Sequence, residues 1–590
     1  MLTVSSNKQN LLLLPSQVKF MKDSKWTIEA YCGEQRPSDW STLPTSSLSF
    51  LNQLNLSATH PFCGSEAPQP YEIPGVPSQG PLLTNDHLES FWDVVLTITA
   101  KGVPSLIAIG ELWLRLCSSI LAPIGLAHLL YTSIKGISDQ DSKTATRPQK
   151  VFLSVTCLLS VASSIVLFTD TLYVLEYGPV YALFLVYDYE TGAFTFGDSA
   201  ERCEIAEGLY YNQENEFINK LVEHWPLSQR TYSKEYGASP WIPTGDGRTG
   251  LPFLLNLVRD FSYTRVWLPL DDGEVTALDI GFPEAGHDVT KPLYLILHGL
   301  NGGSQEGYVQ DFTWRRTGEG STVVVMIARG LGDLPIRGWD VFHGARISDA
   351  HTAALRLRQT LIGDQILAGV GYSMGAIILS NYVARSGENC ALDSAVAISG
   401  GLDMRFEADF YRAQRLWQPM LAQTLRDDFV VGKWGERVHA RLTKDQMKNL
   451  MRAAHVSEID ETAVVAYNGF RDLDHYYSEM SALGDIPIEE YNGPSLEPQR
   501  RIQSLSIPLL VIHALDDPLV TFRTVGANHG LMHPTNLTKT GTGNLLLLLT
   551  KGGGHVGWPL GWFFFLNTWK WMNDAAMSFT NAVDHSRKEG

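Results

Sequence analysis

The chain has 590 residues, of which 44% are hydrophobic and 18% are charged, and its formal net charge at pH 7 is −17. This length and composition exclude a chain that is disordered throughout, and they allow more than one domain. The acidic balance and the lack of a basic stripe argue against nucleic acid as a partner, and six scattered cysteines without metal-ligand spacing predict no metal centre.

The first third of the chain differs in composition from the rest. Residues 1–85 alternate polar stretches with Pro, Ser and Gly, and they indicate no function. We interpret residues 86–190 as a membrane-anchoring region with two apolar segments, at about 104–134 and 151–187. A linker is predicted over residues 191–250. The chain is therefore expected to be an integral membrane protein of the endoplasmic reticulum or another endomembrane.

The two apolar segments differ in the strength of their pattern. The first contains Glu111 and Arg115, so either a transmembrane helix or an amphipathic helix on the membrane surface fits it. The second begins with residues 151–169, which carry no charge and approach the length that a bilayer demands; a buried core helix is the alternative. If both span, the basic residues of the connecting loop favour a cytosolic loop and a lumenal C-terminal domain.

From residue 251 short apolar runs alternate with longer helix-compatible stretches. Continuous apolar strands separated by helices are typical of a mostly parallel, doubly wound α/β sheet, which we predict over residues 251–580. The predicted strands are Arg265–Leu268, Leu293–Leu297, Val323–Ala328, Gln365–Val370, Ala395–Ser399, Pro508–Ala514 and Leu545–Thr550. Residues 403–501 interrupt this rhythm with charged, aromatic, helical sequence. Their place between two strands predicts a helical insertion that caps one end of the sheet.

One pentapeptide within this α/β pattern carries a chemical signal. Gly371-Tyr372-Ser373-Met374-Gly375 follows a predicted strand and opens a predicted helix. This Gly-x-Ser-x-Gly pattern is the nucleophile elbow, in which a sharp turn exposes the serine at the N-terminus of a helix. Ser373 is therefore the candidate nucleophile.

A serine nucleophile needs a base, and in this fold the base follows the last strand. Of 16 histidines, only His555 lies in a glycine loop directly after the last predicted strand. The acid that orients the base should follow the preceding strand, where Asp516 and Asp517 compete. The spacing from Ala514 to Val520 favours Asp517, and Asp516 remains the alternative.

Two backbone N–H groups are needed to stabilise the oxyanion of a tetrahedral intermediate. Met374, directly after the nucleophile, is expected to supply the first. The glycine-containing loop that starts at His298 follows an early strand, and Leu300 in it is the expected second donor. We interpret His298 as a structural residue of this loop. No cofactor is required by these groups, and no metal cluster is predicted.

With these parts in order, the chain from about Ser262 to Trp571 resembles the membrane-anchored α/β-hydrolase-domain (ABHD) family, in its abhydrolase-4 subgroup. The resemblance rests on YTRVWLPLDDGEVTALD, LHGLNGGSQEGYV, GYSMGAIILSNYVARSGE, GFRDLDHYYSEMS, ALDDPLV and GGGHVGW. It implies an α/β-hydrolase fold and cleavage of carboxylic esters of lipids, of the acylglycerol or phospholipid type. It also implies catalysis by Ser373, Asp517 and His555.

The sequence therefore predicts a membrane-bound serine hydrolase whose partners are a lipid ester substrate and the membrane. Transfer of the acyl group to an alcohol or amine is an alternative that would use the same acyl-enzyme. A binding protein that keeps the hydrolase shape without catalysis is another. The aromatic residues that follow His555, from 557 to 571, fit either an interfacial patch or a final helix packed on the sheet.

Overall fold

The computed structural model of the chain describes residues 40–59, 203–226, 244–332, 341–407, 417–426, 441–453, 455–488 and 501–589, with a few single residues between these ranges. The two predicted apolar segments, 104–134 and 151–187, lie outside the described residues. Within the described part, no helix combines the length and the apolar composition that a bilayer crossing requires.

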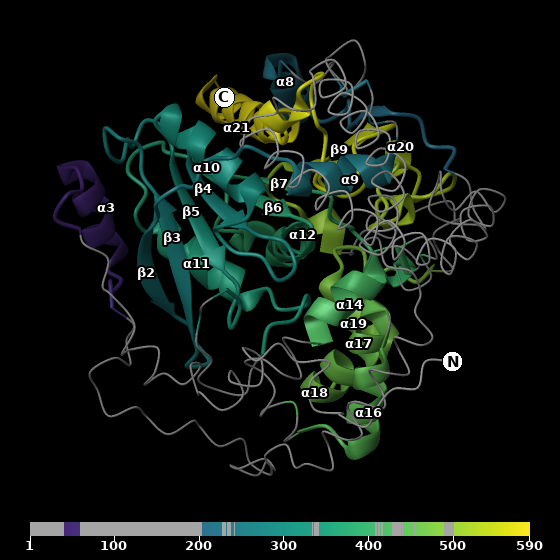
Figure 1. Cartoon of the computed structure of the whole chain (residues 1–590). Helices are drawn as coiled ribbons and strands as arrows, with labels where there is room; N and C mark the ends of the chain where they lie inside the picture. Colours follow the sequence, from purple (N-terminus) through teal and green to yellow (C-terminus); the bar gives the residue numbers. More distant parts are fainter. Residues whose placement is uncertain are drawn as a thin grey trace, which may run out of the picture.

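A nine-stranded sheet forms the centre of the described chain (Figure 1), in the order β1-β9-β8-β7-β6-β4-β5-β3-β2. Strands β4 to β9 pair in parallel, and β1, β2 and β3 add antiparallel edges. The strands are β1 Gly208–Tyr210, β2 Thr264–Pro269, β3 Val275–Gly281, β4 Leu293–Leu297, β5 Thr322–Ile327, β6 Leu367–Tyr372, β7 Ser394–Ile398, β8 Leu509–Ala514 and β9 Leu545–Thr550.

Every predicted strand is present, shifted by at most two residues at an end. The sequence did not predict β3, because Asp279 interrupts its apolar run, nor β1, which has only three residues. Part of the range predicted as a linker is folded, since it contains β1, helix α8 (Glu216–His224) and the start of helix α9 (Gly245–Leu254).

The alternation of side chains along each strand builds a core on each face of the sheet. In β4, Leu293, Leu295 and Leu297 point into one core, and Tyr294 and Ile296 point into the other. Helices α3, α11 and α12 cover the first face, whereas α8, α10 and α21 cover the second. These helices and α9 have the following bounds: α3 Thr45–Leu54, α8 Glu216–His224, α9 Gly245–Leu254, α10 Gly307–Gly318, α11 Ser348–Arg358, α12 Met374–Ser386 and α21 Lys570–Glu589.

A group of helices lies between β7 and β8 in the chain and sits beside one end of the sheet (Figure 1). They are α14 Gln418–Arg426, α16 Lys444–Arg452, α17 Val456–Ile459, a π-helical turn Asp460–Val465, α18 Ala466–Asn468 and α19 Leu473–Met480. They have an apolar core of their own, and Val464 and Tyr476 also pack with Ile377 of α12. The helical insertion therefore stands over the start of α12.

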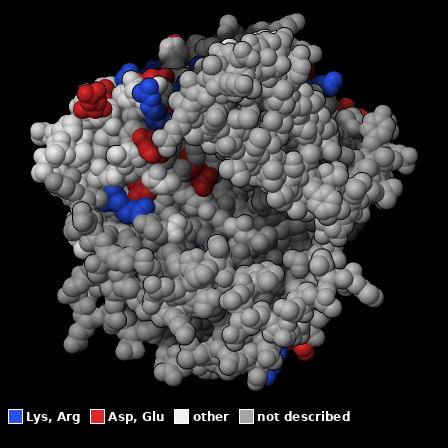
Figure 2. Space-filling view, in the orientation of Figure 1, with Lys and Arg blue, Asp and Glu red and all other residues white. Residues whose placement is uncertain are grey.

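The remaining helical elements are short. They are α20 Pro534–Leu537 and the 3₁₀ turns Gly387–Asn389, Met404–Phe406, Arg501–Ser504, Phe522–Thr524 and Phe564–Leu566. On the face shown in Figure 2, acidic and basic side chains of the described residues lie near one another on one side.

Candidate active site

Ser373 stands in a sharp turn between β6 and α12. Its backbone has φ 53° and ψ −120°, a conformation that L-residues rarely adopt, and its N–H donates to the carbonyl of Ile398 over 2.9 Å. A Cβ on Gly375 would lie 2.1 Å from the carbonyl oxygen of Leu297, and one on Gly371 would lie 2.4 Å from that of Gly375. Both glycines are therefore required by the close approach of backbone at this turn.

The structure brings Ser373, His555 and Asp517 into one hydrogen-bonded chain. The Nε2 atom of His555 lies 2.8 Å from Oγ of Ser373. Its Nδ1 atom lies 2.9 Å from Oδ2 of Asp517 and 3.2 Å from Oδ1. A carboxylate accepts the Nδ1–H, which leaves the Nε2 lone pair directed at the serine hydroxyl.

Asp517 is buried and held as a carboxylate. The backbone N–H groups of Leu519 and Val520 each donate to its Oδ1 over 2.9 Å. Burial acts to raise the pKa of Asp517, but the interaction with His555 and the donated hydrogen bonds lower that pKa below its ordinary value. The group therefore stays negatively charged and can stabilise a protonated His555.

Asp516, the alternative acid, has a different set of partners. Its Oδ1 accepts the N–H groups of Gly553 and Gly554, each over 2.9 Å, and its Oδ2 accepts Nη1 of Arg248 over 2.8 Å. Asp516 therefore fixes the glycine loop that carries His555, and it makes no contact with the imidazole. Sequence reasoning missed this role, because Arg248 lies far earlier in the chain.

Two further side chains hold the backbone of the same loop. The N–H of His555 donates to Oγ1 of Thr249 over 2.8 Å, and that of Val556 donates to Oγ of Ser399 over 2.9 Å. Ser399, Val556 and Trp558 have positive φ angles of 52°, 49° and 56°. Strained backbone conformations therefore occur close to His555, as is common at functional sites.

The loop after β4 holds the predicted oxyanion donor Leu300. As predicted, His298 has a structural role there: its Nδ1–H donates to the carbonyl of Gly299 over 2.8 Å, and its Nε2 accepts the N–H of Ala328 over 3.0 Å. Burial lowers the pKa of His298, which agrees with a neutral ring that uses both nitrogens. The backbone N–H groups of Leu300 and Met374 have no acceptor among the described residues.

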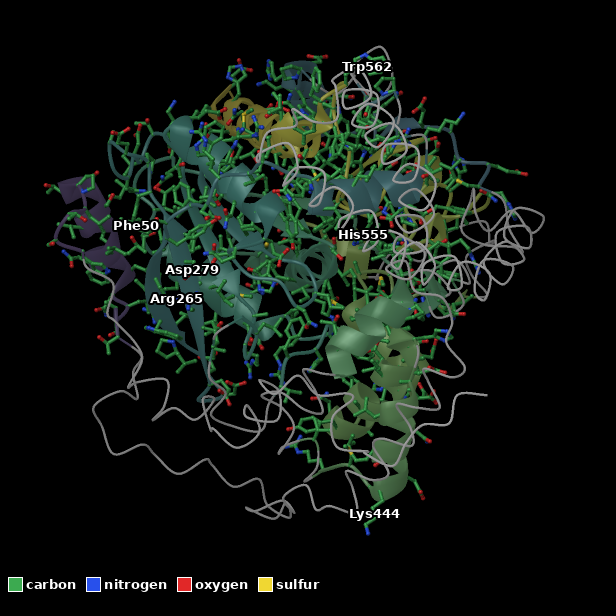
Figure 3. The ribbon with its side chains drawn as sticks, in the orientation of Figure 1. Phe50, Arg265, Asp279, Lys444, His555 and Trp562 are labelled. Atoms are coloured by element: carbon green, nitrogen blue, oxygen red, sulfur yellow. The ribbon has the colours of Figure 1, made fainter. Side chains whose placement is uncertain are left out.

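Asp279 ties this loop to the edge of the sheet. Ser304 donates its hydroxyl to Oδ2 of Asp279 over 2.5 Å. Arg265 on β2 donates to the two oxygens of the same carboxylate over 2.6 and 2.8 Å, and Figure 3 shows the two side chains side by side. This ion pair, buried on the Asp279 side, therefore anchors the loop that carries Leu300.

A pocket opens beside the two expected oxyanion donors. Its wall on the sheet side includes Leu300 and Met374, and its opposite wall comes from the helical insertion. The remaining lining residues are mostly apolar and are Asn301, Leu331, Phe342, His343, Gly344, Leu425, Val456, Ile459, Asp460, Val464 and Tyr476. An apolar group next to the serine would be buried here.

One group of potential metal ligands occurs among the described residues, and it is separate from this site. His224 on α8 and His585 and Glu589 on α21 bring three ligand atoms within 4.8 Å of one another. Lys220 already pairs with Glu589 over 3.1 Å. None of the three contacts the residues around Ser373.

Comparison with known proteins assigns the fold. Residues 292–556 match the family model described as alpha/beta hydrolase fold. The chain is 26% identical to the Protein abhd-3.2 of Caenorhabditis elegans, over 50% of this chain and 74% of that one. It is 26% identical to a monoacylglycerol lipase of Saccharomyces cerevisiae, over 58% and 66% of the two chains, and 24% identical to the Phospholipase ABHD3 of Mus musculus, over 58% and 78%. The chain therefore contains an α/β-hydrolase domain over residues 292–556, and it is similar to ABHD proteins and lipases of that fold.

Proposed function

We propose that the chain is a membrane-associated serine hydrolase that cleaves carboxylic esters of lipids, of the acylglycerol or phospholipid type. The observation that carries the proposal is the hydrogen-bonded chain from Ser373 through His555 to Asp517. Relatives named monoacylglycerol lipase and phospholipase support a lipid ester as the substrate class.

In the proposed reaction His555 takes the hydroxyl proton of Ser373 as its Oγ attacks the ester carbonyl. The negative charge that develops on the carbonyl oxygen is accepted by the N–H groups of Met374 and Leu300. His555 then gives its proton to the alcohol, which leaves, and an acyl-enzyme on Ser373 remains. Water deprotonated by His555 attacks this acyl group and releases the carboxylic acid. Asp517 keeps the imidazole in the orientation that both steps need.

An exposed apolar surface formed by two segments of the chain supports action at a lipid interface. The end of α9 and the loop after His555 meet there, since the N–H of Leu257 donates to the carbonyl of Phe565 over 3.2 Å. Leu254 is 78% exposed and Trp562 is 71% exposed. We call the set of exposed side chains the apolar rim: Leu254, Leu255, Leu257, Trp562, Phe563 and Leu566.

The aromatic residues after His555 differ in their exposure. Trp558, Phe564, Trp569 and Trp571 are buried against the sheet, whereas Trp562 of the rim lies at the outer edge of the molecule (Figure 3). Exposed tryptophan and leucine side chains gain free energy by entering a membrane interface.

Labelling with a fluorophosphonate probe tests the proposed nucleophile. The detergent-solubilised full chain should react with the probe, and both Ser373→Ala and His555→Ala should lose the reaction. A folded wild-type chain that does not react with the probe would refute the proposal. Adding an alcohol acceptor to the hydrolysis assay separates acyl transfer from hydrolysis, because only transfer yields a new ester.

A further inference from the structure

Asp460 and His343 are two of the polar residues that line the pocket beside the oxyanion donors, and the proposed mechanism uses neither. Asp460 opens the π-helical turn of the insertion, and His343 comes from the segment before α11. Leu425, Val456, Ile459 and Val464 line the same pocket with apolar atoms only. A polar group in such surroundings costs free energy unless it is satisfied by a partner.

The carboxyl group of Asp460 has one partner within the described chain. The hydroxyl of Tyr477 donates to its Oδ2 over 3.0 Å. No other described side chain donates to this carboxyl group, and none forms an ion pair with it. Burial raises the pKa of Asp460 to about 7. The Oδ1 atom is therefore left for a ligand in the pocket.

The imidazole of His343 is likewise incompletely bonded. Its Nδ1 atom is buried and has no hydrogen-bond partner among the described residues. The rings of Phe470 and Tyr476 meet it edge-on, with centroids 5.5 and 6.2 Å away. Burial, with added repulsion from Arg346 and Arg329, lowers the pKa of His343 to about 3, so the ring is neutral and offers one donor and one acceptor.

We propose that Asp460 and His343 form a hydroxyl-binding subsite that recognises free hydroxyl groups on the alcohol part of the substrate. The inference rests on the proposed ester hydrolysis and names its substrate class, which is a partial glycerol ester. A hydroxyl group both donates and accepts, so it satisfies a carboxyl group and a neutral imidazole together. A methylene chain satisfies neither.

A cationic headgroup fits these residues less well than a hydroxyl group does. With its pKa near 7, Asp460 carries a proton for part of the time at neutral pH, and a protonated carboxyl group does not attract a cation. The same carboxyl group forms a hydrogen bond with a hydroxyl in either protonation state. An ester with a cationic headgroup is therefore the rival substrate in the test below.

Hydrolysis of three esters with the same acyl chain tests the subsite in the full chain: a monoacylglycerol, an ethyl ester and an acylcholine. Asp460→Leu should lower kcat/KM on the monoacylglycerol by about tenfold, the effect of one lost hydrogen bond, and change it by less than about twofold on the ethyl ester. The kcat/KM of Asp460→Asn on the monoacylglycerol should lie between those of the wild type and Asp460→Leu, since an amide can still form a hydrogen bond with a hydroxyl group. His343→Leu should also lower kcat/KM on the monoacylglycerol.

Glu461→Gln is the matched control, because it removes a charge from the adjacent, exposed position and should change no rate. Fluorophosphonate labelling of Ser373 at the wild-type rate shows that each variant is folded. An equal loss on all three esters would overturn the subsite, as would a loss confined to acylcholine. A wild-type chain that hydrolyses none of them and resists labelling refutes the proposed function itself.

Discussion

Asp516 and Asp517 are neighbours in sequence, yet the structure gives them separate tasks. Asp517 contacts His555, whereas Asp516 binds the loop backbone and Arg248. The loss of an orienting carboxylate in a Ser-His-Asp arrangement typically costs about 10⁴-fold in kcat. The loss of a loop anchor displaces the imidazole but leaves its partner in place.

We therefore expect Asp517→Asn to lower kcat by about 10³- to 10⁴-fold, and Asp516→Asn by roughly 10- to 100-fold. Steady-state hydrolysis of one soluble ester by both variants measures the two effects. Arg248→Gln should resemble Asp516→Asn, because it removes the other half of the same ion pair. A larger loss for Asp516→Asn than for Asp517→Asn would reverse the assignment.

Helix α3 is held against the sheet by a buried histidine. The backbone N–H of His287 donates to Oγ of Ser47 over 3.2 Å. The centroid of its imidazole ring lies 4.4 Å from that of the Phe50 ring, and its Nδ1 atom lies 2.8 Å from Oγ1 of Thr322. Burial lowers the pKa of His287 to about 4. Its Nε2 is buried without a partner among the described residues, so a proton there would find no acceptor.

This histidine should make the fold sensitive to acid. In the unfolded chain a histidine binds a proton below pH about 6.5, and in the folded chain His287 does so only near pH 4, so stability falls as the pH falls between those values. Because of this group, the free energy of unfolding should be about 2 kcal/mol lower at pH 5 than at pH 7. Urea unfolding at pH 7 and pH 5 measures it. His287→Gln should lose that pH-dependent part, and His529→Gln, at an exposed position, should keep it.

The apolar rim is a feature of two elements, the end of α9 and the loop after His555. If the rim contacts a bilayer, changing both Leu254 and Trp562 to Ser should weaken binding to phosphatidylcholine vesicles by roughly tenfold or more. The reason is that the variant has less apolar side-chain area to bury in the membrane. Vesicle flotation measures the binding. Ile362→Ser is the matched control, because Ile362 is 49% exposed but precedes β6, at the opposite end from Ser373. Equal binding by both variants would contradict a role for the rim.

At the scale of the whole molecule, the sequence predicted what local pattern encodes. Apolar runs located the parallel strands, and Gly-x-Ser-x-Gly and the glycine loop at His555 located residues that the structure brings together. The contact of Thr249 with the His555 loop and that of Arg248 with Asp516 had no local signal, because they join segments about 300 residues apart. The position of Asp460 in the pocket had no local signal either, since it depends on how the insertion packs over α12.

The role of Ser373 is tested most directly by the rate at which the detergent-solubilised full chain hydrolyses a monoacylglycerol, compared with that of Ser373→Ala. Without the Oγ atom no acyl-enzyme can form, so we predict hydrolysis by the wild type and a loss of at least about 10³-fold in the variant, with unchanged thermal unfolding. Hydrolysis by Ser373→Ala at the wild-type rate would contradict the assignment of the nucleophile, on which every later step depends.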